Sequence, residues 1–175
     1  MIRTRLPAVL ALASVALLTA APAHAATPPV NTGTVDVDYA CEEPPFPPAD
    51  TVFRITFTVP PRVTKGAQIP VGVKLQTTTP APEGLEANTM TGQVKVIAGG
   101  AGSITQTAYG LTNPVVPPAG DPLTLSGGLT SFTANAKGTW NFTPGVVETV
   151  YEELGYHLVC TPKSTPRVAV STVVG

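Results

Sequence analysis

Apolar and polar side chains alternate along most of this chain, and this alternation restricts the fold more than any other feature of the sequence. In segment 35–41, for example, Val35, Val37, Tyr39 and Cys41 are separated by acidic or small residues. Successive side chains of a β-strand point to opposite faces, so a period of two predicts strands with one buried face. The same pattern recurs at 53–59, 69–75, 93–96, 123–125, 140–142, 156–160 and 168–174. The chain is therefore predicted to be all-β, with at most one helical turn near 148–154.

The connections between these segments are rich in turn residues. The sequence contains 20 Pro and 16 Gly, many of them clustered between the alternating runs. Short strands at such spacing are typical of a sandwich or a barrel. We expect an immunoglobulin-like antiparallel β-sandwich in architecture only. Trp140 precedes the second cysteine, and Leu158 stands where a true immunoglobulin domain has its corner tyrosine.

The first 25 residues have the pattern of an export signal. Arg3 and Arg5 precede the apolar run 6–20, and Ala23-His24-Ala25 is a small-x-small cleavage site. We predict cleavage after Ala25, a β-sandwich domain at 26–162 and a strand-like tail at 163–175. A membrane anchor is disfavoured because Pro7 and Pro22 interrupt or flank the only long apolar run. The protein is expected to be secreted and to have no membrane association after signal removal.

The charge of the mature chain excludes one large class of partner. Two of the ten basic side chains lie in the signal, so eight remain against eleven acidic ones. A net charge of −3 gives no basic patch for phosphates, and no nucleic-acid partner is expected.

The two cysteines are informative because export places them in an oxidising compartment. Cys41 and Cys160 have no other thiol to pair with, so one disulfide between them is predicted. The alternative is a free reactive thiol or a metal thiolate with His157 as the only other soft ligand.

Four segments carry a resemblance to a known family. Their order resembles a domain found in exported proteins of high-GC Gram-positive (actinobacterial) bacteria. The segments are Val37–Cys41, Val59–Gly66, Val116–Leu123 and Cys160–Pro162, within a span from Gly33 to Pro162. The resemblance implies a secreted, disulfide-closed β-sandwich of unknown function, and it brings no catalytic residues. This chain departs from the family in its acidic, proline-rich insert at 42–48, which puts in doubt any binding role of that turn.

Residues for catalysis, metals or cofactors are scarce. His157 is the only histidine after signal removal, and no serine stands in a Gly-x-Ser-x-Gly elbow. Asp36 and Asp38 share one strand face and would suit either calcium or plain solvation. The glycine-rich segment 99–102 lacks the lysine and helix of a phosphate loop and is interpreted as a hairpin. We predict no catalytic residues, no metal site and no cofactor.

A few features favour a binding function. The segment Pro44-Pro45-Phe46-Pro47-Pro48 is predicted to be a polyproline II stretch that docks a partner, or a stiff surface connection. The tail would complete its own sheet or pair with another molecule. The leading hypothesis is a non-enzymatic structural or interaction domain that binds another exported protein or a cell-wall component. The alternatives are a carbohydrate- or wall-binding module using Tyr109, Tyr151 or Trp140, and an inhibitor or adaptor of a secreted complex.

Overall fold

The structure is a computed structural model that describes residues 28–175 except 45, 82 and 83. The predicted export signal at 1–25 lies outside these residues. The described chain forms ten β-strands and one turn of 3-10 helix, η1 (Glu152–Leu154), which follows the helical turn expected near 148–154. The strands are β1 (Asn31–Glu43), β2 (Phe46–Val59), β3 (Arg62–Val63), β4 (Gln68–Pro80), β5 (Met90–Gly100), β6 (Ile104–Thr112), β7 (Pro122–Thr133), β8 (Gly138–Tyr151), β9 (Tyr156–Pro162) and β10 (Val170–Val174).

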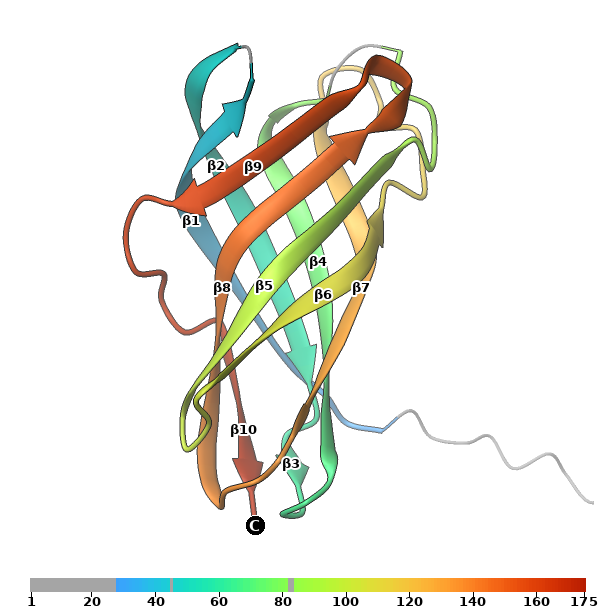
Figure 1. Cartoon of the computed structure of the whole chain (residues 1–175). Helices are drawn as coiled ribbons and strands as arrows, with labels where there is room; N and C mark the ends of the chain where they lie inside the picture. The colour runs from blue at the N-terminus through green and yellow to red at the C-terminus, as the bar shows by residue number, and fades with distance from the viewer. Residues whose placement is uncertain (1–27, 45, 82–83) are drawn as a thin grey trace, which may run out of the picture.

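All ten strands belong to one sheet that closes on itself. Their order is β3-β10-β8-β5-β6-β7-β4-β2-β1-β9, and an additional β8–β9 pairing joins the two arms. Figure 1 shows β9, β8, β5 and β6 in front of β1, β2, β4 and β7, so the closed sheet has two facing sides. The pairings are antiparallel except for the short parallel contact between β3 and β10. The all-β prediction is confirmed, and the immunoglobulin-like form of the sandwich stays a prediction.

The core lies between these two sides and follows the predicted alternation. The inward residues of β1, β2 and β4 are buried, and the residues between them are more exposed. Aromatic rings connect the two sides: the ring centroids of Phe132 on β7 and Phe142 on β8 lie 5.3 Å apart. Trp140 is completely buried, and its indole nitrogen donates a hydrogen bond to the Ala136 carbonyl at 3.0 Å. Trp140 is therefore part of the core.

The tail predicted at 163–175 joins the sheet of its own chain. β10 pairs with β8 from Val170 to Val174, and the backbone of Gly175 bonds to Val63 and Lys65. Of the two possibilities for the tail, pairing within the chain is the one observed.

The glycine-rich segment 99–102 is a hairpin, as predicted. It connects β5 to β6, with Ala98 paired to Ile104 and the Gly102 N–H donating to the Gly99 carbonyl at 3.3 Å. A Cβ at position 102 would overlap the Trp140 ring. A glycine is therefore required at this position by core packing.

Candidate functional site

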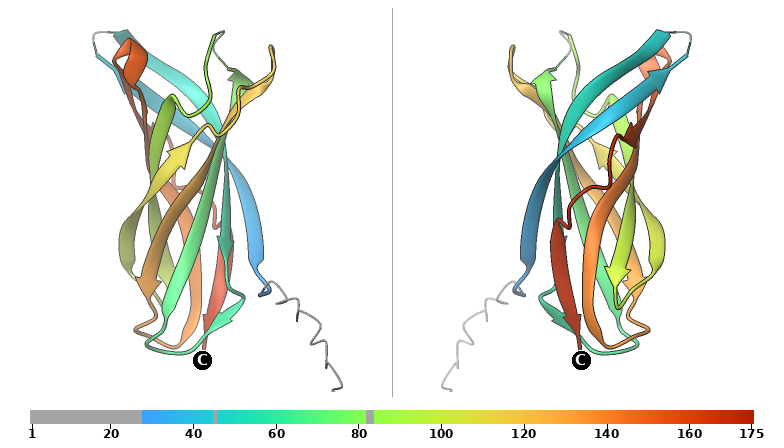
Figure 2. Two further views of the ribbon diagram at one scale, coloured as in Figure 1. Left: turned by 90° about the vertical axis from the view of Figure 1, so that its right-hand side faces the viewer. Right: turned by 90° about the vertical axis from the view of Figure 1, so that its left-hand side faces the viewer.

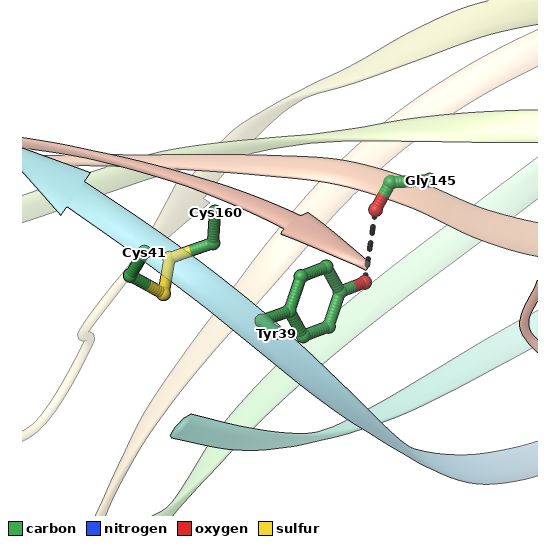
Figure 3. Close-up of a disulfide and its surroundings, with 4 residues drawn as sticks. All are labelled: Tyr39, Cys41, Gly145 and Cys160. Atoms are coloured by element: carbon green, nitrogen blue, oxygen red, sulfur yellow. Dashed lines mark hydrogen bonds between the residues drawn. A yellow bond between two sulfur atoms is a disulfide. The ribbon is translucent and has the colours of Figure 1, made fainter. Parts of the chain in front are cut away.

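The predicted disulfide is present and lies directly across two neighbouring strands. Cys41 on β1 faces Cys160 on β9, and their Cα atoms are 3.9 Å apart. Figure 3 shows the bridge beside Tyr39, whose hydroxyl donates a hydrogen bond to the Gly145 carbonyl on β8 at 2.9 Å. The bridge and this hydrogen bond therefore connect β1 to β9 and β8, where the sheet closes. A free thiol or a metal thiolate at these cysteines is excluded.

The proline-rich segment 44–48 lies between β1 and β2, and its last three residues belong to β2. Phe46 pairs with Glu43, so Phe46, Pro47 and Pro48 begin strand β2. Pro44, Pro47 and Pro48 are exposed, whereas Pro45 lies outside the described residues. The segment thus remains open to a partner, as a hairpin tip.

Of the three aromatic residues considered for sugar stacking, only one is accessible. Trp140 is completely buried and Tyr151 is 9% exposed, whereas Tyr109 on β6 is 63% exposed. A stacking platform needs an open ring face, so Trp140 is removed from the candidates and Tyr109 is retained.

A backbone bulge sets the position of Tyr109. On β6, Leu111 pairs with Gly92 and Ala108 pairs with Val94, so Tyr109 and Gly110 together lie opposite Gln93 of β5. Gly110 has φ +85°, a conformation that residues with a Cβ rarely adopt. Bulges of this kind redirect a side chain and are common beside functional sites.

Polar side chains of β5, β8 and β9 lie on the same outer face of the sheet as Tyr109. Gln93 on β5 pairs with Glu148 on β8, and its amide Nε2 donates to Glu148 Oε2 at 2.7 Å. His157 on β9 places Nε2 3.7 Å from the same Oε2. Tyr109, Gln93, Glu148 and His157 therefore form a continuous band over four strands.

These residues line a shallow surface groove of about 450 Å³, which we call the outer groove. Its described lining residues are Thr91, Gly92, Gln93, Tyr109, Gly110, Leu111, Thr112, Glu148, Val150 and His157. The volume falls in the range of small-molecule sites. The groove offers an aromatic ring, an amide, one carboxylate and one imidazole, and no serine or cysteine is among its described lining residues.

Of the two acidic residues weighed for calcium, Asp36 and Asp38, the first is engaged in an ion pair with Arg54. Asp36 accepts two hydrogen bonds from Arg54, at 2.8 and 3.0 Å, and this contact lowers the pKa of Asp36. Asp50 is paired with Lys163 at 2.6 Å. Within the described chain, no group of three or more His, Cys, Asp or Glu residues is placed to hold a metal ion. Asp36 thus acts in cross-strand pairing.

Tyr109 and His157 were considered from the sequence, but their proximity was not predicted, and Gln93 and Glu148 were given no functional role. Their proximity depends on the β5–β8 and β8–β9 registers, and the first of these joins Gln93 to Glu148 across 55 positions of the sequence. A buried polar side chain, Asn113, was also given no role from the sequence. Asn113 is completely buried and accepts a hydrogen bond from the Met90 N–H at 2.8 Å while donating to the Glu86 carbonyl at 2.6 Å.

None of the protein-family models, curated proteins or solved structures compared with this chain matches it. The resemblance to exported domains of high-GC Gram-positive bacteria therefore stays a prediction from the sequence. No helix among the described residues has the length and apolar character to cross a membrane.

Proposed function

We propose that this chain is a secreted, non-enzymatic interaction domain of the bacterial exterior, and that the outer groove is its binding face. The observation that carries the proposal is the band of Tyr109, Gln93, Glu148 and His157 on one face of a disulfide-linked sheet. Side chains held on strands keep their relative positions, so little ordering is needed when a partner binds. The expected partner is another exported protein or a cell-wall component.

Binding is favoured over catalysis by the composition of the groove. Covalent catalysis needs a nucleophile next to a base, and carboxylate-based hydrolysis needs two acidic groups. The groove has a single carboxylate, Glu148, which is already engaged by Gln93 and lies near His157. These groups suit hydrogen bonding to a ligand.

The proposal also includes an extracellular location and an immunoglobulin-like form of the β-sandwich. A disulfide is consistent with an oxidising, extracellular location. The signal pattern at 1–25 and the resemblance to actinobacterial secreted domains support the same location. The two facing sides of the sheet support an immunoglobulin-like sandwich, although each side continues into the other through β9 and through the short β6–β7 contact.

A carbohydrate of the cell wall is the second candidate ligand. Tyr109 offers an apolar ring face with a polar tip, and Gln93, Glu148 and His157 supply donors and acceptors beside it. Few precisely placed polar groups around an apolar surface are typical of small-molecule sites. An inhibitor or adaptor role would instead use the exposed hairpin tip at Pro44, Pro47 and Pro48.

The test is retention on two immobilised probes: insoluble cell-wall polysaccharide and proteins of the culture medium. Tyr109→Ala is expected to reduce retention on the true partner at least tenfold. Val115→Ala is the matched control, because Val115 is 65% exposed and does not line the outer groove. Equal retention of the two variants would contradict the proposed face. Loss of retention only when Pro44–Pro48 is deleted would favour the adaptor.

A further inference from the structure

The closed sheet has a second pocket at the end where β1 is followed by β2. Its volume is about 380 Å³, and we call it the end pocket. At this end β1, β2 and β9 lean away from the end of β4 and the start of β7 (Figure 2). The described lining residues come from seven strands of the closed sheet: Cys41, Ala49, Asp50, Thr51, Phe53, Leu75, Thr77, Thr79, Pro80, Met90, Leu123, Leu125, Thr149 and Leu158.

The lining of the end pocket is mainly apolar and continuous with the core. Phe53, Leu75 and Leu125 are buried residues of that core. The Thr77 hydroxyl in this lining is engaged within the protein: it accepts from the Leu123 N–H at 2.9 Å and donates to the Thr79 carbonyl at 2.7 Å. Closed sheets of eight strands hold small ligands in their mouths in the same way. The pocket therefore suits the apolar part of a small molecule.

A smaller cavity of about 150 Å³ adjoins the end pocket and shares Met90, Thr149 and Leu158 with it. Glu43 from β1 lines this cavity, and its Oε1 atom is buried without a hydrogen-bond partner among the described residues. A buried carboxylate oxygen without a donor is costly, and it gains most from a charged donor. Such an atom beside an apolar pocket indicates the polar end of a ligand.

The surrounding charges favour a cation at this position. Tyr151 also lines the smaller cavity, and its hydroxyl donates to Glu153 Oε2 at 3.2 Å. Burial, this hydrogen bond and the negative charges of Glu153 and Glu86 raise the pKa of Tyr151. The hydrogen bond places the Glu153 carboxylate beside a residue that lines the cavity. Tyr151 and Tyr156 also bring aromatic rings, whose faces attract ammonium groups.

We propose that the end pocket binds an apolar amine, with its hydrocarbon part among Phe53, Leu75 and Leu125 and its ammonium group on Glu43. The amine donates hydrogen bonds to Glu43 Oε1, which has no other described partner. This site is separate from the outer groove, because no residue is shared between the two lining sets. It extends the proposed function from a surface interaction to the capture of a small molecule.

The test compares three probes with the same hydrocarbon chain, octylamine, octanol and octanoic acid, by calorimetric titration of the disulfide-bonded protein. We expect saturable binding of one octylamine, weaker binding of octanol and the weakest binding of octanoate. Absence of saturable octylamine binding, or octanoate binding as tight as octylamine, would overturn the proposal.

Three variants locate the site. Glu43→Gln is expected to weaken octylamine binding at least tenfold and to leave octanol binding nearly unchanged. Glu42→Gln is the matched control, because Glu42 is an exposed neighbouring carboxylate that lines neither cavity. Ala49→Phe, at an exposed position of the lining, should narrow the mouth and reduce the binding of both probes.

Denaturant unfolding of each variant separates a lost site from a lost fold. Glu43→Gln removes the charge of a carboxylate whose Oε1 atom is buried without a partner, so it should unfold at the same or a higher denaturant concentration than the unmodified protein. Equal effects of Glu43→Gln and Glu42→Gln on octylamine would overturn the role of Glu43. Unchanged octylamine binding in Ala49→Phe would overturn the location.

Discussion

Tyr39 connects two strands that have no backbone pairing with each other. Its side chain is completely buried, and its hydroxyl reaches from β1 to the Gly145 carbonyl on β8. On β8, Gly145 and Val146 together lie opposite Lys95, which is a bulge that interrupts the β5–β8 ladder. The tyrosine thus supplies a donor to a carbonyl within a bulge, where ladder hydrogen bonding is disrupted.

Tyr39→Phe tests this bond at two values of pH. At neutral pH the variant should lose about 1–2 kcal/mol of unfolding free energy, because the Gly145 carbonyl stays buried without its donor. Burial raises the pKa of the Tyr39 phenol above its ordinary value of 10.0. Above pH 10.0 the phenol of the unfolded chain loses its proton, whereas the buried phenol of the folded chain keeps it. The free energy of unfolding of the unmodified protein is therefore unaffected by this group below pH 10.0 and falls as the pH rises toward the folded-state pKa. Urea unfolding should therefore show the difference narrowing above pH 10.0.

Tyr109→Phe is the control for this prediction, because Tyr109 is 63% exposed. It should leave stability unchanged at neutral pH. A Tyr39→Phe variant as stable as this control would show that the hydroxyl contributes nothing to the fold.

At the level of elements, β10 makes the end of the described chain part of the fold. Val170 and Val174 are buried, and the Thr172 hydroxyl donates to the Pro60 carbonyl at 2.6 Å. β10 also covers the edge of β8 that lies away from β5 near Trp140. Buried and exposed side chains alternate along this short strand, so substitutions at two neighbouring positions should differ in their effect on the free energy of unfolding.

Val174→Ala should lower the free energy of unfolding by about 2 kcal/mol, because two buried methyl groups are removed. Val173→Ala on the same strand should change it by less than about 0.5 kcal/mol, because Val173 is 40% exposed. Chemical denaturation of both variants is the measurement. Equal losses of unfolding free energy in the two variants would mean that β10 does not pack with Val174 facing the core.

The elements also show why some strands could be predicted from the sequence and why β6 could not. Residues 35–41, 53–59 and 69–75 alternate strictly, and their inward sets are buried or nearly so. Strand β6 was not predicted, because the bulge at Tyr109-Gly110 spaces the buried residues Ala108 and Leu111 three positions apart. The same bulge places Tyr109 in the outer groove. The alternation of apolar and polar residues therefore fails to predict a strand at the position where the candidate site lies.

At the level of the whole molecule, the fold depends on contacts between distant parts of the chain. β9 closes the sheet by pairing with both β1 and β8, and the disulfide links residues separated by 119 positions. This bridge was predicted from the count of two cysteines together with the export signal. The sequence could not predict the strand order or the end pocket, because both depend on registers between strands that are far apart in sequence.

Replacing both cysteines by alanine should lower the free energy of unfolding by about 2–5 kcal/mol, because the unfolded chain loses a long-range crosslink. The reduced, unsubstituted protein should show a similar loss, which controls for the substitutions themselves. Thermal unfolding with and without reductant is the measurement. If both proteins unfolded at the temperature of the oxidised form, the bridge would be dispensable for stability.

The position of the disulfide also determines how the protein responds to proteases in its surroundings. The connection between β6 and β7 is exposed at Val115 and Val116, and it is an accessible place for cleavage. A cut there leaves Cys41 on one fragment and Cys160 on the other, still bonded and still paired through β1 and β9. The two fragments of a cleaved molecule would therefore stay covalently linked until the disulfide is reduced. The strands that line the outer groove and the end pocket would remain in one molecule.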